Sequence, residues 1–166
     1  MDQSAFYGVV SAINFTLLGL WWVAVKDRVS VGSTGTGFHR MAYFVSLQFV
    51  IPATVSLLAQ VAPDRSEVWR SAFAIAGIAG AVGVGMLARE MTHHSASAYV
   101  PKVFGILGVP LYVLVLVVAL WPGTISDIGI DMAPIEVEGL LLSVLIFLGV
   151  QEAWFVSMTP PPAAQR

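Results

Sequence analysis

Five long runs of apolar residues divide this chain and restrict what it can fold into. They cover residues 5–25, 41–62, 71–88, 103–121 and 139–158 of the 166 in the chain. A helix of about 20 residues crosses the hydrocarbon core of a bilayer, which is about 30 Å thick, and each run has roughly that length. We therefore expect an all-α, multi-pass membrane bundle of five helices. It forms one domain over residues 1–158, followed by a proline-rich tail over residues 159–166.

The overall composition supports the same class. Hydrophobic residues make up 57% of the chain, charged residues 11%, and the mean hydropathy is +0.83. Ordinary soluble domains contain roughly 25% charged residues. The chain has no cysteine, which excludes disulfides and thiolate metal sites. The N-terminus lacks the basic segment of a signal peptide, so we keep the first run as a span.

Basic residues are distributed unequally between the connections. Those flanking the first and third connections are Lys26, Arg28, Arg40, Arg89 and Lys102; the second has Arg65 and Arg70, and the fourth has none. Cytoplasmic loops carry the excess of lysine and arginine. We expect the N-terminus outside and the C-terminus in the cytoplasm. The chain then belongs in the cell membrane, and we favour a bacterial inner membrane over an organelle.

A glutamate interrupts the last apolar run. If this span is centred near Leu148, Glu152 lies about 6 Å inward of the midplane. An ionised carboxylate at that depth costs at least about 2.5 kcal/mol, so the side chain should face protein or water and be paired or protonated. Two roles are open: a structural clamp with Arg89, Lys102 or Lys26, or the handling of a proton or cation.

Three amide side chains accompany this glutamate. Asn14 lies near the middle of the first run, Gln48 in the inner half of the second, and Gln151 beside Glu152. Together they predict an intramembrane polar cluster that lines a transport pathway. The alternative is that each amide only hydrogen-bonds to a neighbouring helix, as such residues often do in membranes.

Two runs contain a central proline, Pro52 and Pro110. Proline cannot donate to the carbonyl four residues earlier, and its ring displaces that carbonyl. We predict a helix kink at each proline. At Pro52 the freed carbonyl belongs to Gln48, so an amide side chain and a backbone oxygen coincide at one height.

The third run carries small residues four positions apart. Gly77, Ala81 and Gly85 form one such series, and Gly80 belongs to another. Small residues let helix backbones approach closely. They predict a packing face, which could serve packing within the chain, an oligomer interface or a pore lining.

The fourth connection is acidic. It contains Asp127, Asp131, Glu136 and Glu138 without a basic residue, and we expect it to form an outer loop with a short amphipathic segment. In an oligomer these acids could ring a vestibule that concentrates cations, although a solvated negative loop is the commoner outcome.

Other chemistry finds little support in the sequence. His93 and His94 are adjacent, so on a helix they point about 100° apart, and we interpret them as interfacial loop residues rather than metal ligands. Neither a Ser/His/Asp nor an HExxH constellation is present. We expect no enzyme activity, cofactor, metal or nucleic-acid partner.

Two functional classes remain. The first is a small channel or transporter, forming a homo-oligomer, that passes a cation or proton. It needs an oligomer because five helices alone enclose little aqueous volume. The second is a non-catalytic accessory or assembly subunit that packs against other membrane subunits. The carbonyl freed at Gln48 favours transport, which is the function we predict.

Overall fold

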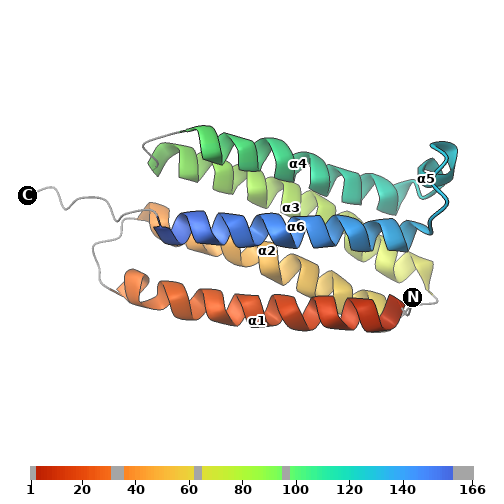
Figure 1. Cartoon of the computed structure of the whole chain (residues 1–166), viewed down its shortest axis with the longest axis horizontal. Helices are drawn as coiled ribbons and strands as arrows, with labels where there is room; N and C mark the ends of the chain where they lie inside the picture. The colour runs from red at the N-terminus through yellow and green to blue at the C-terminus, as the bar shows by residue number, and fades with distance from the viewer. Residues whose placement is uncertain (1–2, 31–35, 62–64, 95–97, 159–166) are drawn as a thin grey trace, which may run out of the picture.

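The computed structural model describes residues 3–30, 36–61, 65–94 and 98–158, and within these ranges the chain is helical without strands. Its long helices are α1 (Gln3–Ser30), α2 (Thr36–Val61), α3 (Ser66–His94), α4 (Tyr99–Leu120) and α6 (Pro134–Met158); α5 (Gly123–Asp127) is short. The five long helices have the length and hydropathy of membrane spans. This confirms the all-α, five-helix membrane bundle. The start of α1 and the end of α6 lie at opposite ends of it (Figure 1).

The helices extend beyond the apolar runs, and two sequence predictions are wrong for that reason. The helix α6 begins at Pro134, so Glu136 and Glu138 are helical rather than in an outer loop. Proline suits the first turn of a helix, and the Glu136 carboxylate accepts a hydrogen bond from the Ala133 amide at 3.0 Å, which caps the start. Likewise α3 continues to His94, beyond the point where a loop was expected. The tail, residues 159–166, lies outside the described residues.

The helix α2 forms the centre of the bundle. It contacts α1, α3 and α6, and 56% of its span is buried, against 28% for α1. The Trp21 indole donates a hydrogen bond to the Ala42 carbonyl at 3.0 Å, which joins α1 to α2. Ser46, Gln48 and Ser56 of α2 are therefore buried against protein rather than facing lipid.

The most extensive helix contact is between α3 and α4, and glycine makes it possible. A Cβ atom at Gly77 would lie 2.9 Å from the Tyr112 carbonyl, and one at Gly80 would overlap the Tyr112 ring. At Gly85 a Cβ would have only an ordinary contact, 3.9 Å from Val109, while Ala81 packs at the edge of the core. The small-residue face thus packs α3 against α4 within the chain.

Both prolines lie inside continuous helices. The helix α2 runs through Pro52, which is buried, and α4 runs through Pro110, which is exposed. The kinks remain predictions. The Gln48 carbonyl faces α6, since its oxygen lies 3.8 Å from the position of a Cβ at Gly149.

Charged side chains gather at the two ends of the bundle. At one end Arg40 forms an ion pair with Glu90 at 2.8 Å, which links α2 to α3. At the other end Arg70 donates to the carbonyls of Ala119 and Leu120, at 2.8 and 3.0 Å, and so satisfies the end of α4. We call these the inner and outer ends, following the orientation predicted from the sequence.

Candidate functional site

The buried face of α6 carries a carboxyl group near each of its ends. Glu138, Leu142, Leu145, Gly149 and Glu152 are all buried, at alternating spacings of four and three that place them on one face of the helix. Glu138 is 0% exposed and Glu152 is 1% exposed. The two glutamates lie about 21 Å apart along the helix axis. One face of a single helix therefore spans most of the membrane with an acid near each side.

The inner glutamate belongs to a polar site formed by three helices. Gly149 on α6 packs against Gln48 of α2, since a Cβ there would lie 3.1 Å from the Gln48 Cβ. The Tyr112 hydroxyl of α4 donates a hydrogen bond to the Gln48 side-chain oxygen at 2.9 Å. Glu152 follows Gly149 by one turn on the same buried face of α6, which places it one turn from the contact with Gln48. We define Glu152, Gln48 and Tyr112 as the inner site.

Asn14 faces the same interior from α1. It is 0% exposed, and its amide donates to the Val10 carbonyl at 2.8 Å, which leaves the side-chain oxygen available. The height of Asn14 in the bundle follows from the hydrogen bond between Trp21 and Ala42. Asn14 precedes Trp21 by two turns of α1, and α2 runs antiparallel to α1. That distance, about 10 Å, brings Asn14 near the level of Gln48.

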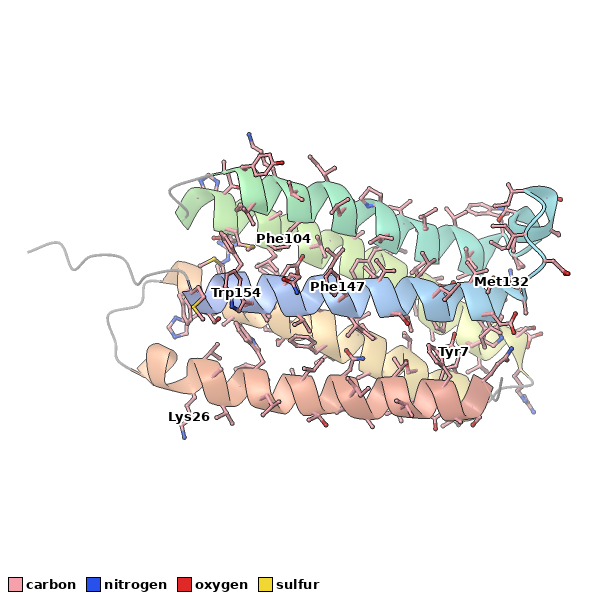
Figure 2. All side chains as sticks on the ribbon, viewed as in Figure 1. Tyr7, Lys26, Phe104, Met132, Phe147 and Trp154 are labelled. Atoms are coloured by element: carbon pink, nitrogen blue, oxygen red, sulfur yellow. The ribbon has the colours of Figure 1, made fainter. Side chains whose placement is uncertain are left out.

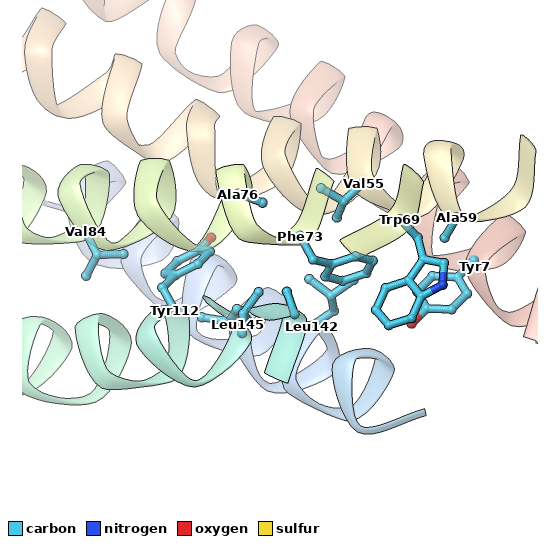
Figure 3. Close-up of a cluster of buried hydrophobic side chains, with 12 residues drawn as sticks. Tyr7, Val55, Ala59, Trp69, Phe73, Ala76, Val84, Tyr112, Leu142 and Leu145 are labelled. Carbon is cyan, nitrogen blue, oxygen red and sulfur yellow. The ribbon is translucent and has the colours of Figure 1, made fainter. Parts of the chain in front are cut away.

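The outer glutamate lies among aromatic side chains. The Tyr7 hydroxyl of α1 lies 3.5 Å from the position of a Cβ at Gly139, the residue after Glu138, and donates to the Ile135 carbonyl at 2.6 Å. Around Tyr7 lie Trp69 and Phe73 of α3, and Figure 3 shows these rings packed together near Leu142. Figure 2 shows Tyr7 directed from α1 into the bundle. We define Glu138 and Tyr7 as the outer site.

Two serines lie between these sites. Ser11 lies on α1 between Tyr7 and Asn14, at spacings of four and three residues, and is 3% exposed. Ser56 is 0% exposed and lies on α2 two turns from Gln48 towards the outer end. The buried polar side chains thus follow one another along the bundle, roughly one helical turn apart.

Within the described part of the chain, several buried polar atoms lack a hydrogen-bond partner. They are Asn14 Oδ1, Gln48 Nε2, Ser56 Oγ, both carboxyl oxygens of Glu138 and Glu152 Oε2. Buried polar groups without partners are rare and costly, so those in a native fold require an explanation. All six atoms belong to the two sites or to the residues at and between their levels.

The clamp predicted for Glu152 is contradicted. Lys26, Arg89 and Lys102 are exposed, and among the described side chains none forms an ion pair with Glu152. Long basic side chains near helix ends extend towards water, which separates them from a fully buried acid. Gln151 is half-buried, one residue outside the buried face, so it does not join the inner site.

Apolar clusters separate the inner site from water at the inner end. Val25, Val45, Leu87, Met91 and Val156 are each at most 1% exposed and form one cluster from four helices. This packing fills the interior of the bundle between its inner end and the level of Glu152 with apolar side chains.

The acids predicted for the outer loop divide into two groups. Asp127 ends α5 and Asp131 follows it, and both are exposed, whereas Glu138 is part of the interior. Ile125 is buried and anchors α5 to the bundle. The short segment expected on the outer surface is thus a five-residue helix.

Sequence reasoning missed Glu138, Tyr7 and Tyr112 as members of polar sites. A signal for Glu138 was present, because it lies two heptads before Glu152 and so shares its helix face. Pro134 and Glu136 supplied the second signal, since they mark a helix start before Glu138. Nothing in the sequence distinguished the two tyrosines from ordinary core residues.

No group of three or more histidine, cysteine or acidic side chains that could hold a metal ion occurs among the described residues. The polar interior consists instead of single carboxyl, amide and hydroxyl groups. The chain matches no protein-family model, no curated protein and no solved structure in the comparisons made.

Proposed function

We propose that this membrane protein transports a proton or a small cation, and that Glu152 carries it through the inner half of the membrane. The observation behind the proposal is that Glu152 is 1% exposed with no basic partner among the described residues. A carboxyl group inside a membrane is costly and is a functional candidate by default. Its burial without a clamp removes the structural explanation for that cost.

The surroundings of Glu152 support a role in transport. The Tyr112 hydroxyl fixes the Gln48 side-chain oxygen, which directs the Gln48 Nε2 donor into the interior. Asn14 contributes an acceptor oxygen near the same level. Glu152 Oε2, Gln48 Nε2 and Asn14 Oδ1 are all buried without partners, so a bound proton, cation or water molecule at this level would find both a donor and acceptors.

The polar groups belong to the interior of a single chain. An accessory subunit would use such groups against a partner, but Gln48, Asn14 and Glu152 are each at most 2% exposed in the chain by itself. Burial inside the chain therefore favours transport over an assembly role. It also removes the need for an oligomer to form the path, while assembly of several chains remains a separate prediction.

The test is Glu152→Gln in vesicles that contain the purified protein. A membrane potential is imposed, and the flux of protons, Na⁺ and K⁺ is followed with a separate indicator dye for each. Wild-type protein should pass at least one of these ions. The amide keeps the shape of the side chain and cannot titrate, so Glu152→Gln should reduce flux to the level of protein-free vesicles. Its thermal stability should equal or exceed that of wild type, because an unpaired buried acid is removed.

The control is Glu67→Gln, which removes the same charge from an exposed position at the start of α3. It should leave flux unchanged. Wild-type flux in Glu152→Gln, or the absence of any flux in wild type, would refute the proposal.

A further inference from the structure

We propose that Glu138 and Tyr7 form a second, outer station on the same path, and that the transported species is a proton rather than a metal cation. This inference rests on the proposed function, since it extends the path from Glu152 to the other side. Its basis is the outer site itself, a fully buried carboxyl group on the same helix face as Glu152.

The geometry of Glu138 points to a ligand. Both of its carboxyl oxygens are buried without a hydrogen-bond partner among the described residues. Ion pairing cannot account for its burial. Arg70 of α3, a basic side chain at the outer end, donates instead to the carbonyls of Ala119 and Leu120. A carboxyl group in these surroundings needs a bound positive species, because an isolated charge there is too costly.

The donor set selects the species. Hard metal cations take about six or more oxygen ligands. The outer site offers the two oxygens of Glu138 and the Tyr7 hydroxyl, which already donates to the Ile135 carbonyl. A proton needs a single oxygen, and its transfer to a neighbour breaks one O–H bond as another forms. The site therefore fits a proton and is too poor in ligands for a metal cation.

A route from the outer end reaches Tyr7. A pocket of about 180 Å³ lies between α1 and α6, lined by Gln3, Phe6, Tyr7, Glu136 and Gly139 among others. Water occupies about 30 Å³ per molecule in the liquid, so the pocket has room for several molecules. Most of the lining is apolar, and Gln3 and Glu136 are its polar side chains; water that enters beside them would reach Tyr7, while Glu138 itself does not line the pocket.

Buried polar residues lie at the levels between the two stations. From Glu138 the order along the bundle is Ser56 and Ser11, then Asn14 and Gln48, then Glu152. The steps are about one helical turn each, longer than a direct hydrogen bond, so proton transfer along this path would use bridging water molecules.

Other titratable groups near Glu138 are few among the described residues. On α1 the facing group is Tyr7; the outer half of α2 contributes none, and the outer half of α4 contributes only Tyr112, which is bound to Gln48. Arg70 of α3 is bound to the end of α4, and Glu136 and Asp127 are exposed. Titration of the outer station should therefore reflect Glu138 itself.

The experiment compares Glu138→Gln with Glu67→Gln in proteoliposomes, with proton and Na⁺ flux measured separately. Glu67 is exposed at the start of α3, at the same end of the bundle. We expect wild type and Glu67→Gln to conduct protons without Na⁺. Glu138→Gln should be silent, although it is folded by size-exclusion chromatography.

The outcomes separate the two proposals. Wild-type proton flux in Glu138→Gln, with Glu152→Gln silent, would overturn the outer station and leave the proposed function standing. Flux of Na⁺ or K⁺ that depends on Glu152 would overturn the choice of the proton alone. No flux of any kind in wild type would overturn both.

A second measurement covers a Glu138→Gln variant that fails to fold. A hydrophobic carbodiimide reacts with protonated carboxyl groups in apolar surroundings, and mass spectrometry locates the modified residue. In wild-type protein it should modify Glu138 and block proton flux, while Glu136 is spared. Modification that excludes Glu138 would overturn the outer station.

Discussion

The two ends of α6 place the same side chain in different surroundings. At the inner site Glu152 lies near an amide and a tyrosine that hydrogen-bond to each other. At the outer site Glu138 lies among aromatic rings with one hydroxyl nearby, and that hydroxyl is already bound to a carbonyl. The inner site combines a carboxyl group with an amide donor, whereas the outer site offers a carboxyl group and little else. Under the proposed function, this difference would make the inner site a binding station and the outer site a transfer station.

The largest effect should come from the packing that holds the inner site. Gly80→Ala places a methyl group in the Tyr112 ring, and overpacking of this kind costs about 1–3 kcal/mol. Moving the ring also breaks its hydrogen bond to Gln48, so proton flux should fall. Carbodiimide modification of Glu138 should persist, because the added methyl group meets Tyr112 and not Tyr7.

A matched control for this change lies on the same helix. Gly85→Ala adds the same methyl group where the nearest side-chain atom is 3.9 Å away, an ordinary contact. Thermal unfolding in detergent should show a loss of stability for Gly80→Ala only. Equal stability of the two variants would show that Tyr112 is not held as described.

An intermediate effect should separate the two tyrosine hydroxyls. Tyr112→Phe leaves the buried Gln48 oxygen without its donor, which costs about 1–3 kcal/mol. Tyr7→Phe removes a bond to the Ile135 carbonyl, which is only half-buried, and should cost about 0.5–1.5 kcal/mol. Denaturant or thermal titrations of both variants test this order. A larger loss of unfolding free energy for Tyr7→Phe would mean that the Tyr7 hydrogen bond contributes more to stability than the Tyr112 hydrogen bond.

The smallest effect on stability should come from the substitutions that assign the two ends to the two sides of the membrane. Lys26→Cys and Ser126→Cys change exposed positions at opposite ends, so each should shift stability by no more than about 0.5 kcal/mol. The chain has no native cysteine. An impermeant thiol reagent should label Lys26→Cys from the cytoplasmic side and Ser126→Cys from outside. The reverse pattern would invert the names inner and outer.

The sequence was sufficient to predict the spans because the hydropathy of a span is the sum of the contributions of its own residues. Each of the five helices contains a long apolar window, and backbone groups in lipid must bond within the helix. The burial of Glu152, Gln48 and Asn14 could also be predicted, because exposing a polar side chain to lipid is energetically costly and such side chains therefore face the bundle interior. These predictions depend on local composition and not on the positions of partners.

The partners themselves could not be predicted in this way. Tyr112 meets Gln48 across 64 residues of sequence, through a contact that depends on the missing side chain of Gly80. Glu138 was assigned to a loop because hydropathy marks the apolar part of a helix and not its capped first turns. The ion pair predicted for Glu152 was wrong for a similar reason. A lysine or arginine at a similar depth in the membrane can still direct its side chain towards water.

The most direct test of a path contained in one chain is proton flux at a protein-to-lipid ratio low enough that most vesicles hold one chain or none. The fraction of vesicles that lose an imposed pH gradient should then rise linearly with protein, and follow the fraction that contains at least one chain. Vesicles with Glu152→Gln should keep the gradient. A dependence on the square or a higher power of the protein concentration would show that several chains are needed, and would contradict a path through the interior of one.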